Sequence, residues 1–391
     1  MNTILTSCQL ATPFETISDG LVAWDIRGKI IYAGSEKEGA HITGNRIDLK
    51  GMTAIPGLID IHVHGGYGIA FGLGNLSEEL NKYSSWITHF GVTGFVLSIT
   101  GPDPDFILQT IRTYIPLFEK EFAGAQPLGL HLEGPFINPK KHGAFNPAWI
   151  HLPSLKEMSA YLDAGKGWIR QVSLAPEMEG ADQVADLLNN SGVRVALAHS
   201  NADFETARRA LRGKYNHVTH TFNAQSPLHH RKPGVVGAVL NSEGISAELI
   251  ADGVHVHPAA MRILTRCLGA ERIVLISDAM PGAGLPDGTY TLLGQQVAVQ
   301  NGEALLPNGT LAGSTATLDA CVRNMVELAD VPFANAVRMA SYNPAEVIGV
   351  DDHIGSLAPG KKANIAVFDK NLNVKMTFIN GSLVYEENNY G

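Results

Sequence analysis

The chain has 391 residues, of which 45% are hydrophobic and 17% are charged, and its formal net charge is −9. This composition is typical of a globular protein and argues against a nucleic acid or an anionic membrane surface as a partner. The length predicts two to three domains, or one large barrel with a smaller appendage. No apolar run approaches the roughly 20 residues that a transmembrane helix needs.

The first fifty or so residues and the last thirty-five read as short strands separated by turns. The clearest strand candidates are residues 21–25, 29–33, 364–369, 375–379 and 381–385. Asn380-Gly381, between the last two, is a strong hairpin signal. Neither end is long enough to bury a core alone. We therefore predict that residues 1–53 and 357–391 combine into one small β-sandwich domain.

Between the two ends, apolar strand candidates alternate with helical patterns such as residues 77–90 and 181–189. The eight strand candidates lie near residues 57–62, 94–100, 127–132, 170–175, 193–198, 215–219, 246–251 and 272–277. Eight such units predict a (β/α)₈ barrel over residues 54–356. A doubly wound open sheet is the alternative, but no Gly-x-Gly-x-x-Gly motif follows the first strand.

The first barrel strand ends in His62 and His64, and glycines follow at once. Side chains alternate faces along a strand, so both imidazoles point the same way. Two adjacent imidazoles at a strand end can form half of a metal site. The alternative is a pair of buried structural histidines.

Other polar side chains also stand where barrel strands end, which is where barrel enzymes carry their chemistry. They are His131, Glu133, His199, His220, Asp252, His255 and Asp278. A packed apolar core would not place such residues there. Imidazole and carboxylate ligands suit Zn²⁺, Fe²⁺ or Mn²⁺. We therefore predict one or two divalent metal ions per subunit, with Zn²⁺ as the first expectation.

Several segments together resemble one family of enzymes. These are residues 56–65 (PGLIDIHVHG), 131–136 (HLEGPF), 198–202 (AHSNA), 219–224 (THTFNA), 251–255 (ADGVH), 311–314 (LAGS) and 357–364 (LAPGKKAN). The first resembles the opening signature of the amidohydrolase superfamily. In combination the segments resemble its N-acetylglucosamine-6-phosphate and N-acetylgalactosamine-6-phosphate deacetylases, over essentially the whole chain.

This resemblance implies roles for individual residues. Glu133, His199 and His220 would hold the principal metal ion, and His62 and His64 a second one. Asp278 would lie at the metal and act as general base and acid. The implied substrate contacts are Ala144, Phe145, Asn223, Ala224, His255, Leu311, Ala312 and Gly313. Arg231 matches a phosphate-binding arginine that family members can lend across a dimer interface, so a homodimer is expected.

Phe145 departs from the family pattern, because many members have a histidine, and some a glutamine, at this position. Phenylalanine cannot donate a hydrogen bond. Either His142 substitutes through a shifted loop, or a metal ion polarises the carbonyl unaided, or the substrate differs. The choice between the gluco and galacto sugars is left open.

The resemblance implies hydrolysis of a phosphorylated N-acetyl amino sugar to acetate and hexosamine 6-phosphate. The alternatives are a cyclic amidase, an N-acyl-amino-acid deacylase, or a scaffold protein that binds no metal. Cys8, Cys267 and Cys321 are odd in number and widely spaced. This pattern, with no basic and apolar signal segment at the N terminus, predicts a reduced, cytoplasmic environment.

Overall fold

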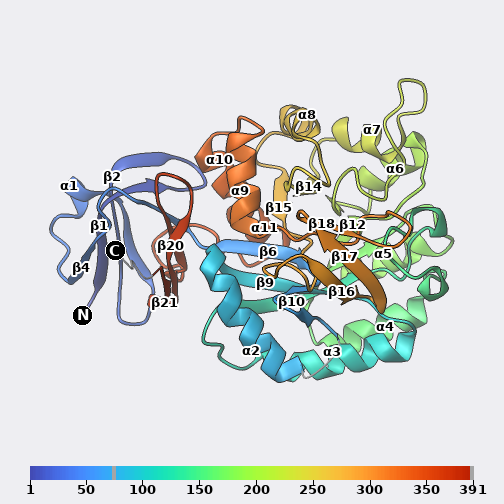
Figure 1. The fold of residues 1–391 in the computed structure, drawn as a ribbon, viewed down its shortest axis with the longest axis horizontal. Helices are drawn as coiled ribbons and strands as arrows, with labels where there is room; N and C mark the ends of the chain where they lie inside the picture. Colours follow the sequence, from blue (N-terminus) through green and yellow to red (C-terminus); the bar gives the residue numbers. More distant parts are fainter. Residues whose placement is uncertain (73–75, 388–391) are drawn as a thin grey trace.

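Residues 1–72 and 76–387 are described by a computed structural model, and they form a barrel with a smaller sheet beside it (Figure 1). The barrel strands are β6 (Leu58–Val63), β9 (Val92–Ile99), β10 (Gln126–Glu133), β11 (Ile169–Leu174), β12 (Arg194–Leu197), β13 (His217–Val218), β14 (Ser246–Ile250) and β15 (Ile273–Ile276). They pair in parallel in this order. Each overlaps one predicted strand, so the predicted (β/α)₈ barrel is confirmed.

The first and last barrel strands meet at their carboxyl ends. The Asp278 N–H donates to the His62 carbonyl at 2.9 Å, and the His64 N–H donates to the Ala279 carbonyl at 2.9 Å. These two backbone bonds place the end of β15 beside the end of β6. The predicted ligands His62 and Asp278, which lie more than 200 positions apart in the sequence, are therefore neighbours in the fold.

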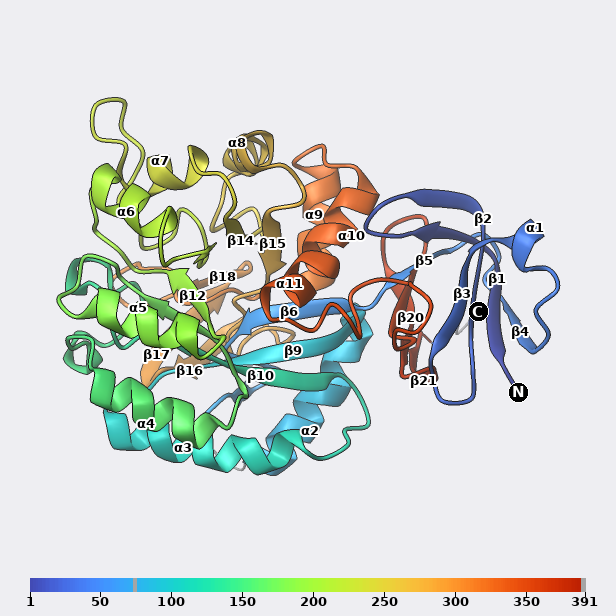
Figure 2. The same ribbon diagram turned by 180° about the vertical axis from the view of Figure 1, so that it is seen from behind.

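Helices surround the barrel on its outside (Figures 1 and 2). They are α2 (Leu76–Ile87), α3 (Pro104–Phe118), α4 (Leu155–Gly165), α5 (Ala181–Asn190), α6 (Phe204–Leu211), α7 (Gly234–Leu240), α8 (Pro258–Leu268), α9 (Leu318–Glu327), α10 (Phe333–Ala340) and α11 (Tyr342–Val347), with short 3-10 turns at Thr88–Phe90, Pro139–Lys141 and Pro147–Trp149. None of those in the described ranges is long and apolar enough to cross a membrane.

Helix α3 shows why these sequences fold as they do. Asp103 accepts a hydrogen bond from the Phe106 N–H at 2.8 Å, and Pro104 follows at the first helical position. Both features favour a helix start. Ile107, Ile111 and Tyr114 then recur at helical spacing and are buried against the barrel.

Strands from both termini form the second sheet. They are β1 (Thr3–Ala11), β2 (Thr16–Trp24), β3 (Ile30–Ser35), β4 (Asn45–Asp48), β5 (Thr53–Pro56), β19 (Ile365–Phe368), β20 (Val374–Ile379) and β21 (Ser382–Glu386), and the short helix α1 (Glu36–Gly39) follows β3. The sheet runs β21-β20-β19-β5-β1-β2-β3, with β4 paired to β1.

This terminal sheet folds over onto itself. Trp24 in β2 contacts Phe378 in β20, with ring centroids 5.4 Å apart, although three strands separate them in the sheet. The two rings share one apolar core with Leu5, Leu10 and Ile365. The predicted β-sandwich from both termini is therefore confirmed, whereas the exact domain limits stay a prediction.

Three further strands, β16 (Gly288–Leu292), β17 (Gln295–Gln300) and β18 (Glu303–Leu305), form a separate antiparallel sheet. Figure 1 shows them in front of the barrel. These three strands were not predicted from the sequence. They lie between β15 and α9, and the β16–β17 turn brings Leu292 and Leu293 to the barrel mouth. A two-stranded pair, β7 (Gly65–Gly66) and β8 (Ile69–Ala70), follows β6.

Candidate metal centre and active site

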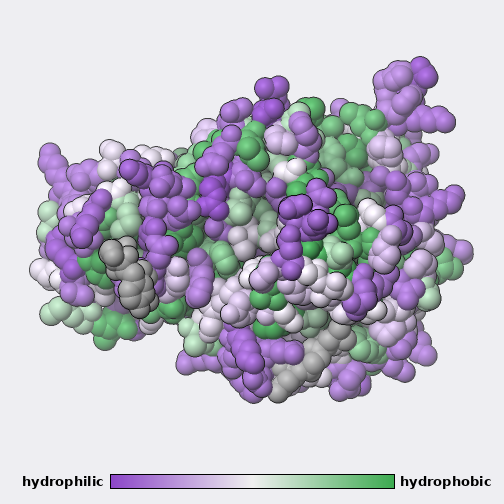
Figure 3. Space-filling view, in the orientation of Figure 1, coloured by the Kyte–Doolittle hydropathy of each residue, from purple (hydrophilic) through white to green (hydrophobic). Residues whose placement is uncertain are grey.

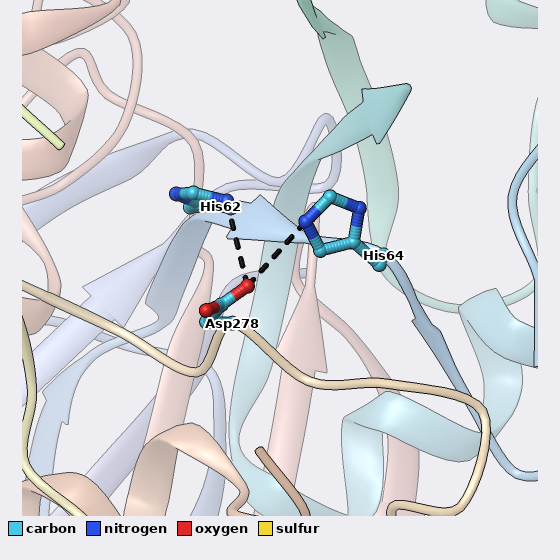
Figure 4. Close-up of side chains that lie close together, drawn as sticks. All are labelled: His62, His64 and Asp278. Carbon is cyan, nitrogen blue, oxygen red and sulfur yellow. Dashed lines mark ion pairs between the residues drawn. The ribbon is translucent and has the colours of Figure 1, made fainter. Parts of the chain in front are cut away.

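The structure brings the six predicted ligands together in two groups at the carboxyl ends of the barrel strands. One group contains His62, His64 and Asp278, and the other contains Glu133, His199 and His220. Within each group the ligand atoms lie within 4.8 Å of one another. Figure 4 shows the two imidazoles of the first group pointing toward the Asp278 carboxylate. All six side chains are buried or nearly so.

Glu133 lies between the two groups. Its Oε2 is 3.0 Å from His64 Nε2 and 3.6 Å from His62 Nε2. Its Oε1 is 3.1 Å from His199 Nε2 and 3.0 Å from His220 Nε2. Each carboxylate oxygen thus faces a different group, which is the arrangement that a bridging ligand requires.

The donor atoms fit a divalent cation. The His199 Nδ1–H donates to the Lys141 carbonyl at 2.7 Å, which leaves the Nε2 lone pair directed at the centre. That Nε2 is 3.1 Å from His220 Nε2. Ligands of a tetrahedral zinc ion lie about 3.3 Å apart, given bonds of about 2.0–2.1 Å. His62 Nε2 is buried without a hydrogen-bond partner among the described residues, as an unused ligand atom would be.

Glu248, in β14, supports this centre and was missed by the sequence analysis. His62 Nδ1 lies 2.9 Å from Glu248 Oε2, so it donates its proton there and keeps Nε2 free. The same oxygen accepts the His220 N–H at 3.1 Å. Its other oxygen accepts from Gln171 at 2.8 Å and lies 3.1 Å from His217 Nε2. One buried carboxylate therefore orients ligands from both groups.

Electrostatics keep the two central carboxylates ionised. Burial alone would raise the pKa of Glu133, but the neighbouring imidazoles of His62, His199 and His220 hold it well below its usual value. Burial likewise opposes charge on Glu248, and His62 and His217 together hold its pKa well below the usual value. Ionised carboxylates are the form that binds a cation.

His131 is not part of the ligand cluster. Its Nδ1 is 2.9 Å from the Ser98 hydroxyl and its Nε2 is 2.7 Å from the Ser173 hydroxyl, so both ring nitrogens have partners. Burial, together with the nearby His62, holds its pKa well below the ordinary value. His131 is therefore a structural histidine inside the barrel.

Three of the six ligands have strained backbones. His199, His220 and Asp278 have φ angles of 43°, 26° and 49°. Residues with side chains rarely adopt this left-handed region, which costs free energy and is concentrated at functional sites. The backbone turns here so that side chains just after the strands point into the barrel mouth. Gly313 also packs here, and a Cβ at this position would lie 3.1 Å from the Asp278 carbonyl oxygen.

A cavity of about 320 Å³ opens above the two groups. Most of the predicted substrate contacts line it, namely Ala144, Phe145, Asn223, Ala224, His255, Leu311 and Gly313. Ala312 is fully buried and is not among the lining residues. Asp252 fixes His255, because its Oδ2 lies 2.6 Å from His255 Nδ1. The sequence analysis did not anticipate Lys140, Lys141, Leu292 and Leu293, which also line the cavity.

Phe145 supplies an apolar wall. Its ring meets His199 edge to face, with centroids 5.1 Å apart and an interplanar angle of 78°. His142 does not line the cavity, and its Nδ1 lies 3.1 Å from the Phe145 carbonyl oxygen. The loop is therefore not shifted in a way that lets His142 replace the missing donor.

Arg231 does not lie at the cavity of its own chain. It is exposed in the loop between β13 and α7, with Nη1 2.7 Å from His230 Nε2. This loop projects from the barrel in Figure 1, and Figure 3 shows the projection as strongly hydrophilic.

The fold and the clustered ligands define the class of protein. The model of the amidohydrolase family matches residues 53–384, so the chain belongs to this family.

Known relatives narrow the assignment. The N-acetylgalactosamine-6-phosphate deacetylase of Escherichia coli O157:H7 is 40% identical, covering 84% of this chain and 86% of the relative. The N-acetylglucosamine-6-phosphate deacetylase of Vibrio furnissii is 37% identical, covering 94% and 91%. The chain thus belongs with the N-acetylhexosamine-6-phosphate deacetylases within that family.

Solved structures agree. The N-acetylglucosamine-6-phosphate deacetylase of Pasteurella multocida superposes with a TM-score of 0.90 at 28% identity, covering 99% of this chain and all of the other. A mutant of the Mycobacterium smegmatis enzyme, in complex with N-acetyl-D-glucosamine-6-phosphate, also gives 0.90, at 32% identity and with 98% and 99% covered.

Proposed function

We propose that this protein hydrolyses the acetamide of an N-acetylhexosamine 6-phosphate, of gluco or galacto configuration, to acetate and hexosamine 6-phosphate. The observation that carries the proposal is Asp278, whose Oδ1 lies 3.5 Å from His62 Nε2 and 3.4 Å from His64 Nε2 at the floor of the cavity. A carboxylate beside clustered metal ligands and below an open cavity suits amide hydrolysis. The substrates of the relatives support the same reaction.

Asp278 moves the proton. It accepts one from the attacking water as the water oxygen bonds to the acyl carbon, and it returns this proton to the amine nitrogen as the C–N bond breaks. A divalent cation held by these side chains would polarise the carbonyl as a Lewis acid and would lower the pKa of a water molecule toward about 7. The backbone bond from the Asp278 N–H to His62 holds the carboxylate beside the ligands throughout.

The chain's own ligands favour Zn²⁺, because four imidazoles and two carboxylates match zinc's usual donors; Fe²⁺ and Mn²⁺ accept the same set. Glu133, His199 and His220 would hold the principal ion. His62 and His64, with Asp278, would hold a second, and Glu133 would bridge the two.

The sugar would lie over Asn223, Ala224, Leu311 and Gly313, and its phosphate would contact His255. Arg231 would reach the phosphate from a second chain, so the active form is a homodimer. The projection of its loop away from the barrel supports this arrangement (Figure 1). Binding the phosphate holds the acetamide in position for attack.

We place this reaction in the cytoplasm. All three cysteines are free thiols, and two of them are buried. Unpaired cysteines are the rule in a reducing compartment. A phosphorylated sugar is likewise a substrate that cells keep inside.

Acetate release tests the proposal. Purified protein loaded with Zn²⁺ should release acetate from N-acetylglucosamine 6-phosphate or its C4 epimer, and the ratio of the two kcat/KM values identifies the preferred sugar. Cyclic amides and N-acetyl amino acids serve as controls. Turnover of a control substrate with no turnover of either sugar phosphate would favour the other amidohydrolase activities.

A further inference from the structure

A second, mostly apolar cavity of about 170 Å³ lies next to the proposed active site. Its apolar lining residues are Ala70, Phe71, Pro102, Phe106 and Trp149. It shares His64, Leu292 and Leu293 with the larger cavity, so the two spaces adjoin at a predicted metal ligand.

The position of His64 decides which part of a substrate would enter this second cavity. His64 Nε2 is 3.4 Å from the Asp278 carboxylate, so a scissile carbonyl attacked with the help of Asp278 would lie beside His64. Asn223, Ala224 and Gly313 line only the larger cavity, where the sugar would lie. The nitrogen and the acyl chain leave the carbonyl carbon in different directions. With the sugar on one side, the acyl chain points toward His64 and the smaller cavity.

Thr100, just after β9, adds one polar group to this lining. Its residue is 8% exposed, and its hydroxyl oxygen has no hydrogen-bond partner among the described residues. A buried hydroxyl is normally paired, because leaving it unpaired costs free energy. A ligand atom in the cavity could pair with it.

We propose that this smaller cavity is an acyl pocket, and that the protein hydrolyses N-acyl groups longer than acetyl, namely propanoyl, butanoyl and hydroxyacetyl. The volume supports this class, since a liquid water molecule occupies about 30 Å³ and the pocket has room for a few additional atoms. The proposal rests on the proposed deacetylation. The reaction is unchanged: water adds its oxygen to the acyl carbon, the C–N bond breaks, and the nitrogen takes the proton.

The test compares kcat/KM for four N-acyl derivatives of the preferred hexosamine 6-phosphate. We expect the propanoyl and butanoyl compounds to be hydrolysed within about tenfold of the acetyl compound. Ala70→Leu fills the pocket, and one misfitted methylene is worth about 10- to 200-fold. This variant should lower kcat/KM for the two longer apolar substrates at least about tenfold while acetyl hydrolysis stays within about twofold.

Thr100→Val is a nearly isosteric variant that removes only the hydroxyl. Propanoyl and hydroxyacetyl groups have almost the same shape, so their ratio reports this hydroxyl alone. We expect the variant to lower the ratio of kcat/KM for the hydroxyacetyl compound to kcat/KM for the propanoyl compound by about tenfold. Thr100→Val also tests the acyl pocket by itself if Ala70→Leu fails to fold.

Two results would overturn the acyl pocket. In one, the acetyl compound is hydrolysed and none of the longer ones is. In the other, Ala70→Leu and Thr100→Val change all four substrates equally. If the acetyl compound is not hydrolysed either, the proposed deacetylase function fails along with it, so the two failures are distinguishable.

Discussion

The two ligand groups are held in place by different means. His199 and His220 follow short strands and keep left-handed backbones, so the strained turns after β12 and β13 aim their side chains. His62 lies within strand β6, and Glu248, 186 residues away in the sequence, orients its ring. The two imidazoles of one group are therefore aimed mainly by left-handed backbone turns, whereas the ring of His62 in the other group is oriented by a buried network across the barrel. Variants in each should have separable effects on metal content.

Glu133→Gln should weaken metal binding at both groups together, because Glu133 contacts both of them. We expect kcat/KM to fall at least about a thousandfold, more than the 10- to 100-fold typical of residues behind the ligands. Metal analysis of the desalted protein should show loss from both sites, with the folded circular dichroism spectrum retained. Normal metal content with near-normal turnover would remove Glu133 from the ligand set.

Asp278→Asn should affect one group only. It removes the proposed acid–base group, and we expect kcat to fall at least about a hundredfold. The Glu133, His199 and His220 group should still hold an ion. Turnover within a few-fold of the unmodified protein would show that another residue transfers the proton.

Arg231→Ala should leave both groups intact, because Arg231 lies in an exposed loop away from them. Loss of a charge-assisted contact costs about 1.5–3 kcal/mol, or roughly 10- to 150-fold in kcat/KM for the phosphorylated sugar, mostly as a higher KM. The same sugar without phosphate should be unaffected. Lys232→Ala, the adjacent residue, is the matched control. An equal loss on both sugars would make Arg231 structural.

Glu248→Gln should weaken the His62, His64 and Asp278 group more than the other, because Glu248 contacts the ring of His62 but only the backbone N–H of His220. A neutral amide cannot hold the His62 proton as strongly, so we expect about 10- to 100-fold weaker binding of one of two ions. Isothermal calorimetry during titration of the metal-free protein with Zn²⁺ measures the affinities of the two metal sites. Gln171→Met is the control, since Gln171 contacts the Glu248 oxygen remote from His62. Unchanged binding at both sites would limit Glu248 to packing.

The sequence predicts the barrel, and the residues that it singles out as metal ligands lie together in the structure, for a physical reason. Parallel strands buried on both faces are continuous apolar runs, and a polar residue at the end of each run stands out against them. His62, His199 and Asp278 were visible in this way. The terminal sandwich was equally predictable from turn signals such as Asn380-Gly381.

Other parts of the site gave no such signal. Glu248 lies inside β14, where a single polar residue in an apolar strand has no periodicity to mark it. The β16–β18 sheet is half exposed and falls between the last barrel strand, β15, and helix α9, so its sequence resembles a loop. Leu292 and Leu293 became visible only when the fold placed their turn over the mouth. Likewise, only the structure shows that the Thr100 hydroxyl has no hydrogen-bond partner among the described residues.

The pairing of β5 with β19 also bears on synthesis. Strand β5 is made early, yet its partner begins only at Ile365, so the ribosome releases nearly the whole chain before this edge can be covered. Until then, β5 presents unpaired backbone groups of the kind that promote aggregation, and Trp24 lacks Phe378. If the barrel folds first, the N-terminal strands remain without their C-terminal partners until synthesis is nearly complete. A chain cut before residue 365 would therefore be prone to self-association during expression, even with every ligand residue present.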